Sequence, residues 1–156
     1  MAFVIDTIDR GKGYAEYSAS ITSGRNRESI IAKLGIAVKH SVEDAEIGAE
    51  VFCFDINLSI DPEYTPAFTI ETSDLCSSVV DVINYVADSY KTEYNRVTFN
   101  TTSENEKEQN IFDRVKSYLL CGNWSKRIVG CYDNAGNYSE DNSRIERNFL
   151  KSKDNY

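Results

Sequence analysis

Histidine is nearly absent from this chain of 156 residues, which contains one, His40. A single histidine excludes metal sites built on a histidine pair and catalytic relays that need a second histidine. The sequence also lacks a Gly-x-Ser-x-Gly motif, and none of its four cysteines forms a Cys-x-x-Cys pair. These absences disfavour hydrolytic, thiol-based and histidine-metal catalysis, so no catalytic residue and no metal site is predicted.

Basic residues are scarce, with 17 lysines and arginines against 25 acidic residues and a formal net charge of −8. A surface of this sign repels phosphate backbones, so we expect no direct contact with nucleic acid. An acidic surface can steer association with basic proteins, including nucleic-acid-handling proteins, although it can equally serve only to keep a chain soluble.

The sequence has no long apolar run and no basic leader before an apolar segment. We therefore expect neither secretion nor membrane insertion, and we expect a cytoplasmic protein. Cys53, Cys76, Cys121 and Cys131 each lie in an apolar run, which is typical of core thiols in a reducing compartment.

The length and the 41% hydrophobic content are sufficient for one domain with a real core, predicted over residues 1–150 with a polar tail at 151–156. Alternating apolar residues predict strands at Ala2–Thr7, Tyr14–Ile21 and Glu50–Ile60. A short strand is predicted at Ala67–Glu71. The pattern of Ile30–Val42 fits a helix or a strand, and its β-branched residues favour the strand.

The segment from Ser73 to Leu120 predicts a helix, a buried strand at Asn95–Asn100 and a second helix. Thr72 or Ser73 can cap the first helix, and Ser103-Glu104-Asn105-Glu106 has the spacing of a capping box for the second. Further strands are predicted at Trp124–Tyr132 and Ile145–Phe149. The predicted fold is α+β, with an antiparallel sheet of about six strands and two main helices packed on one face.

Arg10-Gly11-Lys12-Gly13-Tyr14-Ala15 resembles the pyrophosphate loop of acetyl-CoA-dependent GNAT-type N-acetyltransferases. In that family three strands precede the strand that feeds this loop, and a helix leaves it. The resemblance implies that Arg10, Gly11, Gly13 and Ala15 bind the pyrophosphate of acetyl-CoA. Taken alone, the same residues predict the turn of a β-hairpin without any cofactor.

A second fragment is similar to the same family. Asn105, Ile111, Phe112 and Arg114 match its Asn…Leu-Tyr-x-Lys helix, which also follows a strand. If the likeness extends to activity, Glu16 and Tyr138 are the candidates for a general base.

The succession of a Phe-rich strand, the Val79–Ile83 helix, the Val97-Thr98-Phe99 strand and the Ile111–Val115 helix resembles small uncharacterised tailed-phage proteins. No activity comes with this likeness. Together with the acidity, the small size and the lack of an assembled catalytic constellation, it leads to the first hypothesis, a non-enzymatic accessory protein in the host cytosol that binds and modulates, for example inhibits, a host or viral protein. The acetyltransferase-like enzyme is the first alternative. A structural or assembly component of a phage particle, which would form homo-oligomers, is the second.

Two groups of residues are candidates for the surface of this protein. Asp55, Asp61, Glu63 and Glu71 could converge as a cation site, although solvated strand ends explain them more simply.

Aromatic residues with a polar tip are typical anchors of protein interfaces. Those predicted for an interaction surface are Tyr14, Tyr17, Tyr118, Trp124, Tyr132 and Tyr138.

Overall fold

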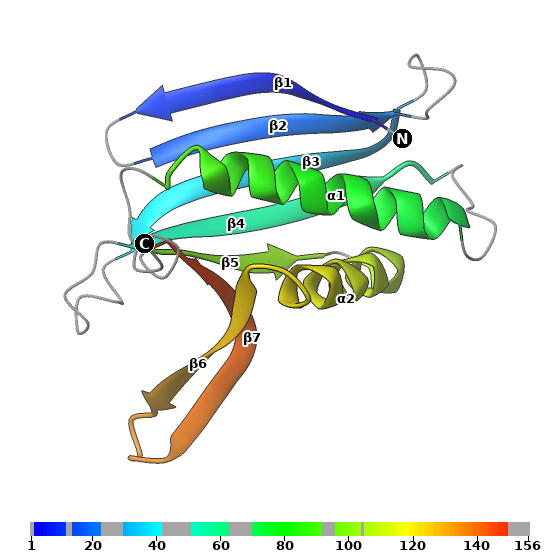
Figure 1. Ribbon diagram of the computed structural model, residues 1–156. Coiled ribbons are helices and arrows are strands. Elements are labelled where there is room, and N and C mark those ends of the chain that lie inside the picture. The colour runs from blue at the N-terminus through cyan, green and yellow to red at the C-terminus, as the bar shows by residue number, and fades with distance from the viewer. Residues whose placement is uncertain are drawn as a thin grey trace.

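The computed structural model describes residues 2–11, 14–22, 30–41, 51–62, 70–91, 96–103 and 105–149. Over these residues seven strands form one sheet in the order β1-β2-β3-β4-β5-β7-β6, and two helices accompany it (Figure 1). The elements are β1 (Ala2–Gly11), β2 (Tyr14–Thr22), β3 (Ile30–Ser41), β4 (Val51–Ile60), α1 (Ile70–Asp88), β5 (Arg96–Thr102), α2 (Glu106–Leu120), β6 (Trp124–Tyr132) and β7 (Tyr138–Asn148). The ambiguous segment at residues 30–42 is thus a strand.

The sheet is antiparallel except for one pair, β4 and β5, which run parallel from Val51 opposite Arg96 to Asn57 opposite Thr102. The prediction of an α+β fold with an antiparallel sheet of about six strands is confirmed in outline; the sheet has seven strands, and this one pair is parallel. Helix α1 lies between β4 and β5 in the chain, and a helical crossover returns the chain to the same edge of the sheet, so the two strands it joins run parallel.

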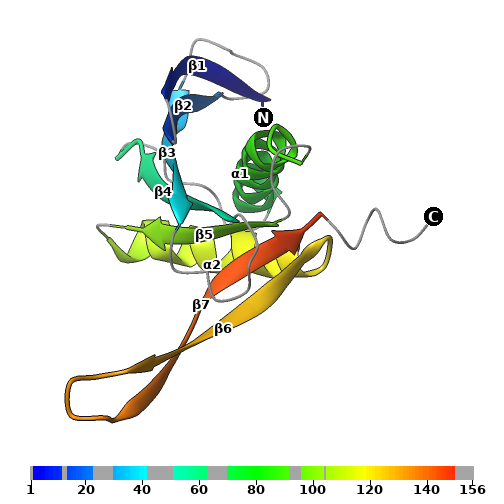
Figure 2. The ribbon, with the colours of Figure 1, turned by 90° about the vertical axis from the view of Figure 1, so that its left-hand side faces the viewer.

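Both helices pack on one face of the sheet, as predicted (Figure 2). The alternating residues of β2, β3 and β4 are buried against them, whereas the intervening residues point to the opposite face. Helix α1 contributes an apolar stripe at spacings of three and four residues, and α2 contributes a second. Buried members of this core include Ile36, Phe54, Ile83, Phe99, Phe112 and Val115.

Strands β6 and β7 form an arm that extends away from the rest of the molecule (Figures 1 and 2). Strand β7 pairs with β5 only from Ile145 to Asn148, and its remaining residues pair with β6 alone. The predicted strand at Ile145–Phe149 is therefore too short, because it covers the buried base of β7 and misses the polar arm that precedes it.

Two predicted boundaries also need correction. Residues 70–71, predicted as the end of a strand, are the first residues of helix α1. The rest of that predicted strand, 67–69, and the predicted tail at 151–156 lie outside the described residues. Asn105, not Ser103, caps α2, since its side chain accepts a hydrogen bond from the Glu108 N–H. Neither described helix is long and apolar enough to cross a membrane.

Candidate functional site

The glycine-rich segment near the N-terminus lies between two strands. Arg10 pairs with Ala15 and Gly11 with Tyr14, so β1 and β2 form a hairpin; Gly13 lies outside the described residues. The hairpin interpretation is confirmed. In the acetyltransferase pattern a helix follows this loop, whereas here the strand β2 follows it, and Ala15 is buried in the core. The helix N-terminus that would bind the pyrophosphate is therefore not next to these residues.

A strand that follows three others and leads to a helix does exist in this fold, and it is β4. The segment between β4 and α1, residues 61–69, contains no glycine, lysine or arginine. It contains Pro62 and Pro66, which have no N–H to donate, together with Asp61 and Glu63. The two prolines therefore cannot donate a backbone N–H to the pyrophosphate of acetyl-CoA, and the two carboxylates carry the same sign of charge as the pyrophosphate.

A crevice opens where the parallel strands part. Pairing between β4 and β5 ends at Asn57 and Thr102, whereas β4 continues to Ile60. A cavity of about 340 Å³ lies at this point. Its lining consists of Asn57, Leu58, Ser59, Thr102, Ser103 and Glu108. Ligands of α/β sheets commonly bind at the carboxyl ends of parallel strands, so this crevice is the first candidate site.

Glu108 is the charged residue of the crevice and is only 7% exposed. It occupies the first turn of α2, where the positive end of the helix dipole favours a carboxylate. Its Oε1 accepts a hydrogen bond from the Ile60 N–H of β4 at 3.4 Å. The sequence analysis missed this residue, although Asn105-x-x-Glu108 has capping-box spacing, because the overlapping Ser103–Glu106 box explained the same helix start.

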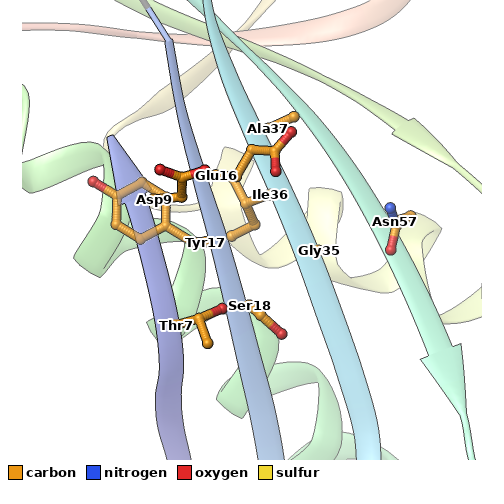
Figure 3. Close-up of a pocket in the computed structure, with 9 residues that line it drawn as sticks. All are labelled: Thr7, Asp9, Glu16, Tyr17, Ser18, Gly35, Ile36, Ala37 and Asn57. Carbon is orange, nitrogen blue, oxygen red and sulfur yellow. The ribbon is translucent and has the colours of Figure 1, made fainter. Parts of the chain in front are cut away.

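A second hollow, of about 340 Å³, lies on the face of the sheet opposite the helices (Figure 3). It exists because Gly35 and Ala37 carry little or no side chain at its centre. Figure 3 shows the side chains of Asp9 and Glu16 on neighbouring strands, with Asn57 across the hollow on β4. Asp9 and Glu16 are directly opposite in the register, so the rim of this hollow is acidic.

The predicted acidic cluster is not assembled by the described part of the chain. Asp55 and Asp61 are six residues apart along the extended β4 direction, about 20 Å at the usual rise of a strand. The side chains of Glu63 and Glu71 lie outside the described residues. No group of three or more metal-ligating side chains is found among those described.

Two of the six predicted surface aromatics are core residues. Tyr17 is 3% exposed, and its hydroxyl lies 2.9 Å from that of Tyr90. Trp124 is 4% exposed; its Nε1 donates to Asn84 Oδ1 at 2.9 Å and its ring meets Phe99 edge-on at 5.3 Å. The alternation of β2 already places Tyr17 on the apolar side of the strand, and it therefore predicts burial of this residue.

Tyr132 and Tyr138 are brought together at the far end of the β6–β7 arm. Their ring centroids are 5.2 Å apart, although the side chains are 74% and 54% exposed. Asp133 orders the turn between them, accepting hydrogen bonds from the Ala135 and Asn137 N–H groups. The hydrogen bond from the Asn137 N–H is the main cause that holds the pKa of Asp133 below its ordinary value.

Tyr14 and Tyr118, the remaining predicted aromatics, are exposed on elements separate from the arm. Tyr118 accompanies Trp124 in the lining of a cleft of about 240 Å³ between α1, the end of α2 and the base of the arm. The Asp88 carboxylate and Arg147 Nη1 form an ion pair at 2.6 Å on the same cleft. This cleft belongs to the junction that anchors the arm.

The two cysteines whose side chains are described differ from each other. Cys76 is buried on α1, and burial raises the pKa of its thiol, an effect that the Arg114 charge partly offsets. Cys121 is exposed after α2. The prediction of a core position is confirmed for Cys76 and is wrong for Cys121. Cys121 caps the C-terminus of α2 and is not part of the apolar stripe of that helix.

No protein-family model and no curated protein matches this chain. Among solved structures it is similar to the aminoglycoside N(6')acetyltransferase from Legionella pneumophila subsp. pneumophila str. Philadelphia 1. The two share 13% sequence identity, the TM-score is 0.44, and the alignment covers 94% of this chain and 69% of that one.

Proposed function

We propose that this chain is a non-enzymatic accessory protein that binds and modulates a protein partner through the end of its β6–β7 arm. The observation that carries the proposal is the Tyr132–Tyr138 pair, two exposed aromatic rings in contact at the tip of a projecting hairpin. Exposed tyrosines held in place are typical interface anchors, because they offer a large contact area at a low cost in conformational entropy.

The charges of the arm support a basic partner. Residues 128–143 contain Asp133, Glu140 and Asp141 and no lysine or arginine, whereas Lys126, Arg127, Arg144 and Arg147 lie toward the base. Carboxylates beside tyrosine rings favour arginine and lysine side chains, through ion pairs and cation–π contacts. A partner in a host cytosol is part of this proposal and follows from the phage-type resemblance of the sequence.

The base of the arm is anchored to the rest of the fold by side-chain contacts. Trp124 joins the arm to α1 through Asn84 and to β5 through Phe99. Arg147 of β7 pairs with Asp88 at the end of α1. A tip held in this way loses less entropy on binding than a flexible loop would.

The test is affinity capture from a bacterial lysate at low salt, with Tyr132→Ser/Tyr138→Ser as the arm variant. Tyr14→Ser is the matched control, because it removes an exposed tyrosine from β2. We expect one partner to be captured by the unaltered chain and by the control, to be lost from the arm variant, and to be weakened by salt. Equal capture by both variants, or none by the unaltered chain, contradicts the proposal.

The two alternatives make different predictions. An acetyltransferase-like enzyme would bind acetyl-CoA, which at a hundred times its dissociation constant would stabilise it by about 2.7 kcal/mol. An unmoved melting curve eliminates that alternative. A particle component predicts discrete oligomers by size-exclusion chromatography with light scattering, and a monomer at all concentrations eliminates it.

A further inference from the structure

The carboxylate of Glu108 is buried with little to satisfy it. In a capping box, Glu108 would turn back to the N–H of Asn105, the residue that caps α2. Its Oε1 instead reaches across to the Ile60 N–H, at the long distance of 3.4 Å. No other hydrogen bond or ion pair to this carboxylate is found among the described residues. An ionised carboxylate can accept about four hydrogen bonds, so most of this capacity is unused in a buried position.

Among the described residues, the lining of the crevice in front of Glu108 combines one carboxylate with hydroxyl groups and includes no lysine or arginine. Besides Glu108 the lining includes Ser59 and Thr102, whose hydroxyl oxygens can accept hydrogen bonds, whereas the Asn57 amide lies beside Gly35 on the open face of the sheet. The Ser103 hydroxyl donates its proton to Gln109 Oε1, which leaves its oxygen available to accept. The chemistry of this lining favours a ligand that donates hydrogen bonds and carries positive charge.

We propose that the crevice between β4 and β5 binds a small ligand through an ammonium or guanidinium group placed on the Glu108 carboxylate. A volume of about 340 Å³ suits a short aliphatic amine. This site is independent of the arm, and it goes beyond the proposed function. Anionic ligands are disfavoured, because Glu108 repels them and the described lining offers no lysine or arginine to offset that charge.

The decisive experiment measures thermal stabilisation and calorimetric binding with putrescine and agmatine as probes. Butanediol and succinate are the neutral and anionic counterparts of putrescine, and acetyl-CoA is a further anionic probe. Glu108→Gln preserves the shape of the side chain and the acceptor for Ile60 but removes the charge. Glu106→Gln removes the same charge from an exposed position two residues earlier in the same helical turn. The two variants therefore have equal net charge.

We expect putrescine or agmatine to stabilise the unaltered chain and Glu106→Gln alike. We expect Glu108→Gln to bind about ten-fold more weakly or worse, because one charge-assisted hydrogen bond is worth about a factor of ten in affinity. Equal weakening in both variants would mean that the amine binds the acidic surface generally, and it overturns the proposal. So does the absence of stabilisation by either amine, or stabilisation by succinate or acetyl-CoA in their place.

Glu108 could instead serve only to hold α2 against the end of β4, and Glu108→Gln could then fail to fold. Ser59→Leu separates the two roles, since Ser59 is exposed at the crevice and leaves the Glu108–Ile60 contact in place. Loss of amine binding in a folded Ser59→Leu protein supports the ligand site. Unchanged binding in that variant overturns it. Neither result depends on Tyr132 or Tyr138, so the failure of this inference is distinct from the failure of the proposed function.

Discussion

The hydroxyl groups of Tyr17 and Tyr90 lie 2.9 Å apart inside the core, although the two residues are 73 positions apart in the chain. Tyr17 comes from the middle of β2, and Tyr90 from the turn that follows α1. The Tyr90 ring also meets Phe54 of β4 edge-on, at 6.1 Å between centroids. The end of α1 is thus fixed to the sheet by a polar contact within an apolar layer.

Replacement of either tyrosine by phenylalanine removes this hydrogen bond without opening a cavity. We expect Tyr17→Phe and Tyr90→Phe each to lower the free energy of unfolding by about 1 kcal/mol, the usual net value of a buried hydrogen bond. The double variant should lose less than the sum, with a coupling of about 0.5–1.5 kcal/mol. Urea unfolding of the four proteins measures this cycle, and strict additivity would show that the contact contributes nothing.

Trp124, the one tryptophan of the chain, provides a second test and a spectroscopic probe. Its indole N–H has a half-buried acceptor in Asn84, so Trp124→Phe leaves that amide oxygen without its donor. We expect a loss of about 1–2 kcal/mol in the free energy of unfolding. Asn84→Ala is the matched partner for a double-mutant cycle. In the unaltered chain, fluorescence emission should shift to the red on unfolding; an emission maximum already typical of exposed indole in the native state contradicts the burial of Trp124.

Asp133 gives the turn of the arm a defined dependence on pH. Its pKa is lowered in the folded chain, mainly by the Asn137 N–H, so its stabilising effect is present above the unfolded pKa of about 3.9. That effect is lost as the pH falls through the still lower folded pKa. NMR titration of the Asp133 carboxyl carbon should give a midpoint below about 3.9, with the Ala135 and Asn137 amide signals moving together with it. Asp133→Asn should abolish the shared titration, and a midpoint at or above the ordinary value would contradict the turn geometry.

Hydrophobic periodicity was sufficient to predict most of this fold. It located both helices and their common face, because a buried stripe repeats every three or four residues and a buried strand face every second one. It could not reveal the parallel pairing of β4 with β5, which depends on the path of α1 between them. It also missed most of β7, since the residues before Ile145 are polar and acquire their strand partners only from β6.

The candidate sites were less predictable for a physical reason. Tyr132 and Tyr138 were both named from the sequence, but their contact arises from the register of the hairpin, which the turn geometry fixes. The importance of Glu108 depends on Ile60, which is 48 residues earlier, and no local pattern links the two. The glycine-rich match at residues 10–15 lies between β1 and β2, without the following helix that the acetyltransferase loop has.

Gly35 provides the last prediction, on the open face of the sheet. A Cβ at this position would lie 2.9 Å from Asn57 Oδ1, closer than such atoms approach, but the Asn57 amide is the exposed end of a movable side chain. We therefore expect Gly35→Ala to change the free energy of unfolding by less than about 1 kcal/mol, because the displaced amide offsets the entropy gained by removing a glycine. In an Asn57→Ala background the obstruction is gone, and the same substitution should stabilise by about 0.4–1 kcal/mol. Chemical unfolding of the four proteins measures both values. If Gly35→Ala lowers the free energy of unfolding by several kcal/mol in the Asn57→Ala background as well, the backbone, and not the Asn57 amide, limits the space above Gly35.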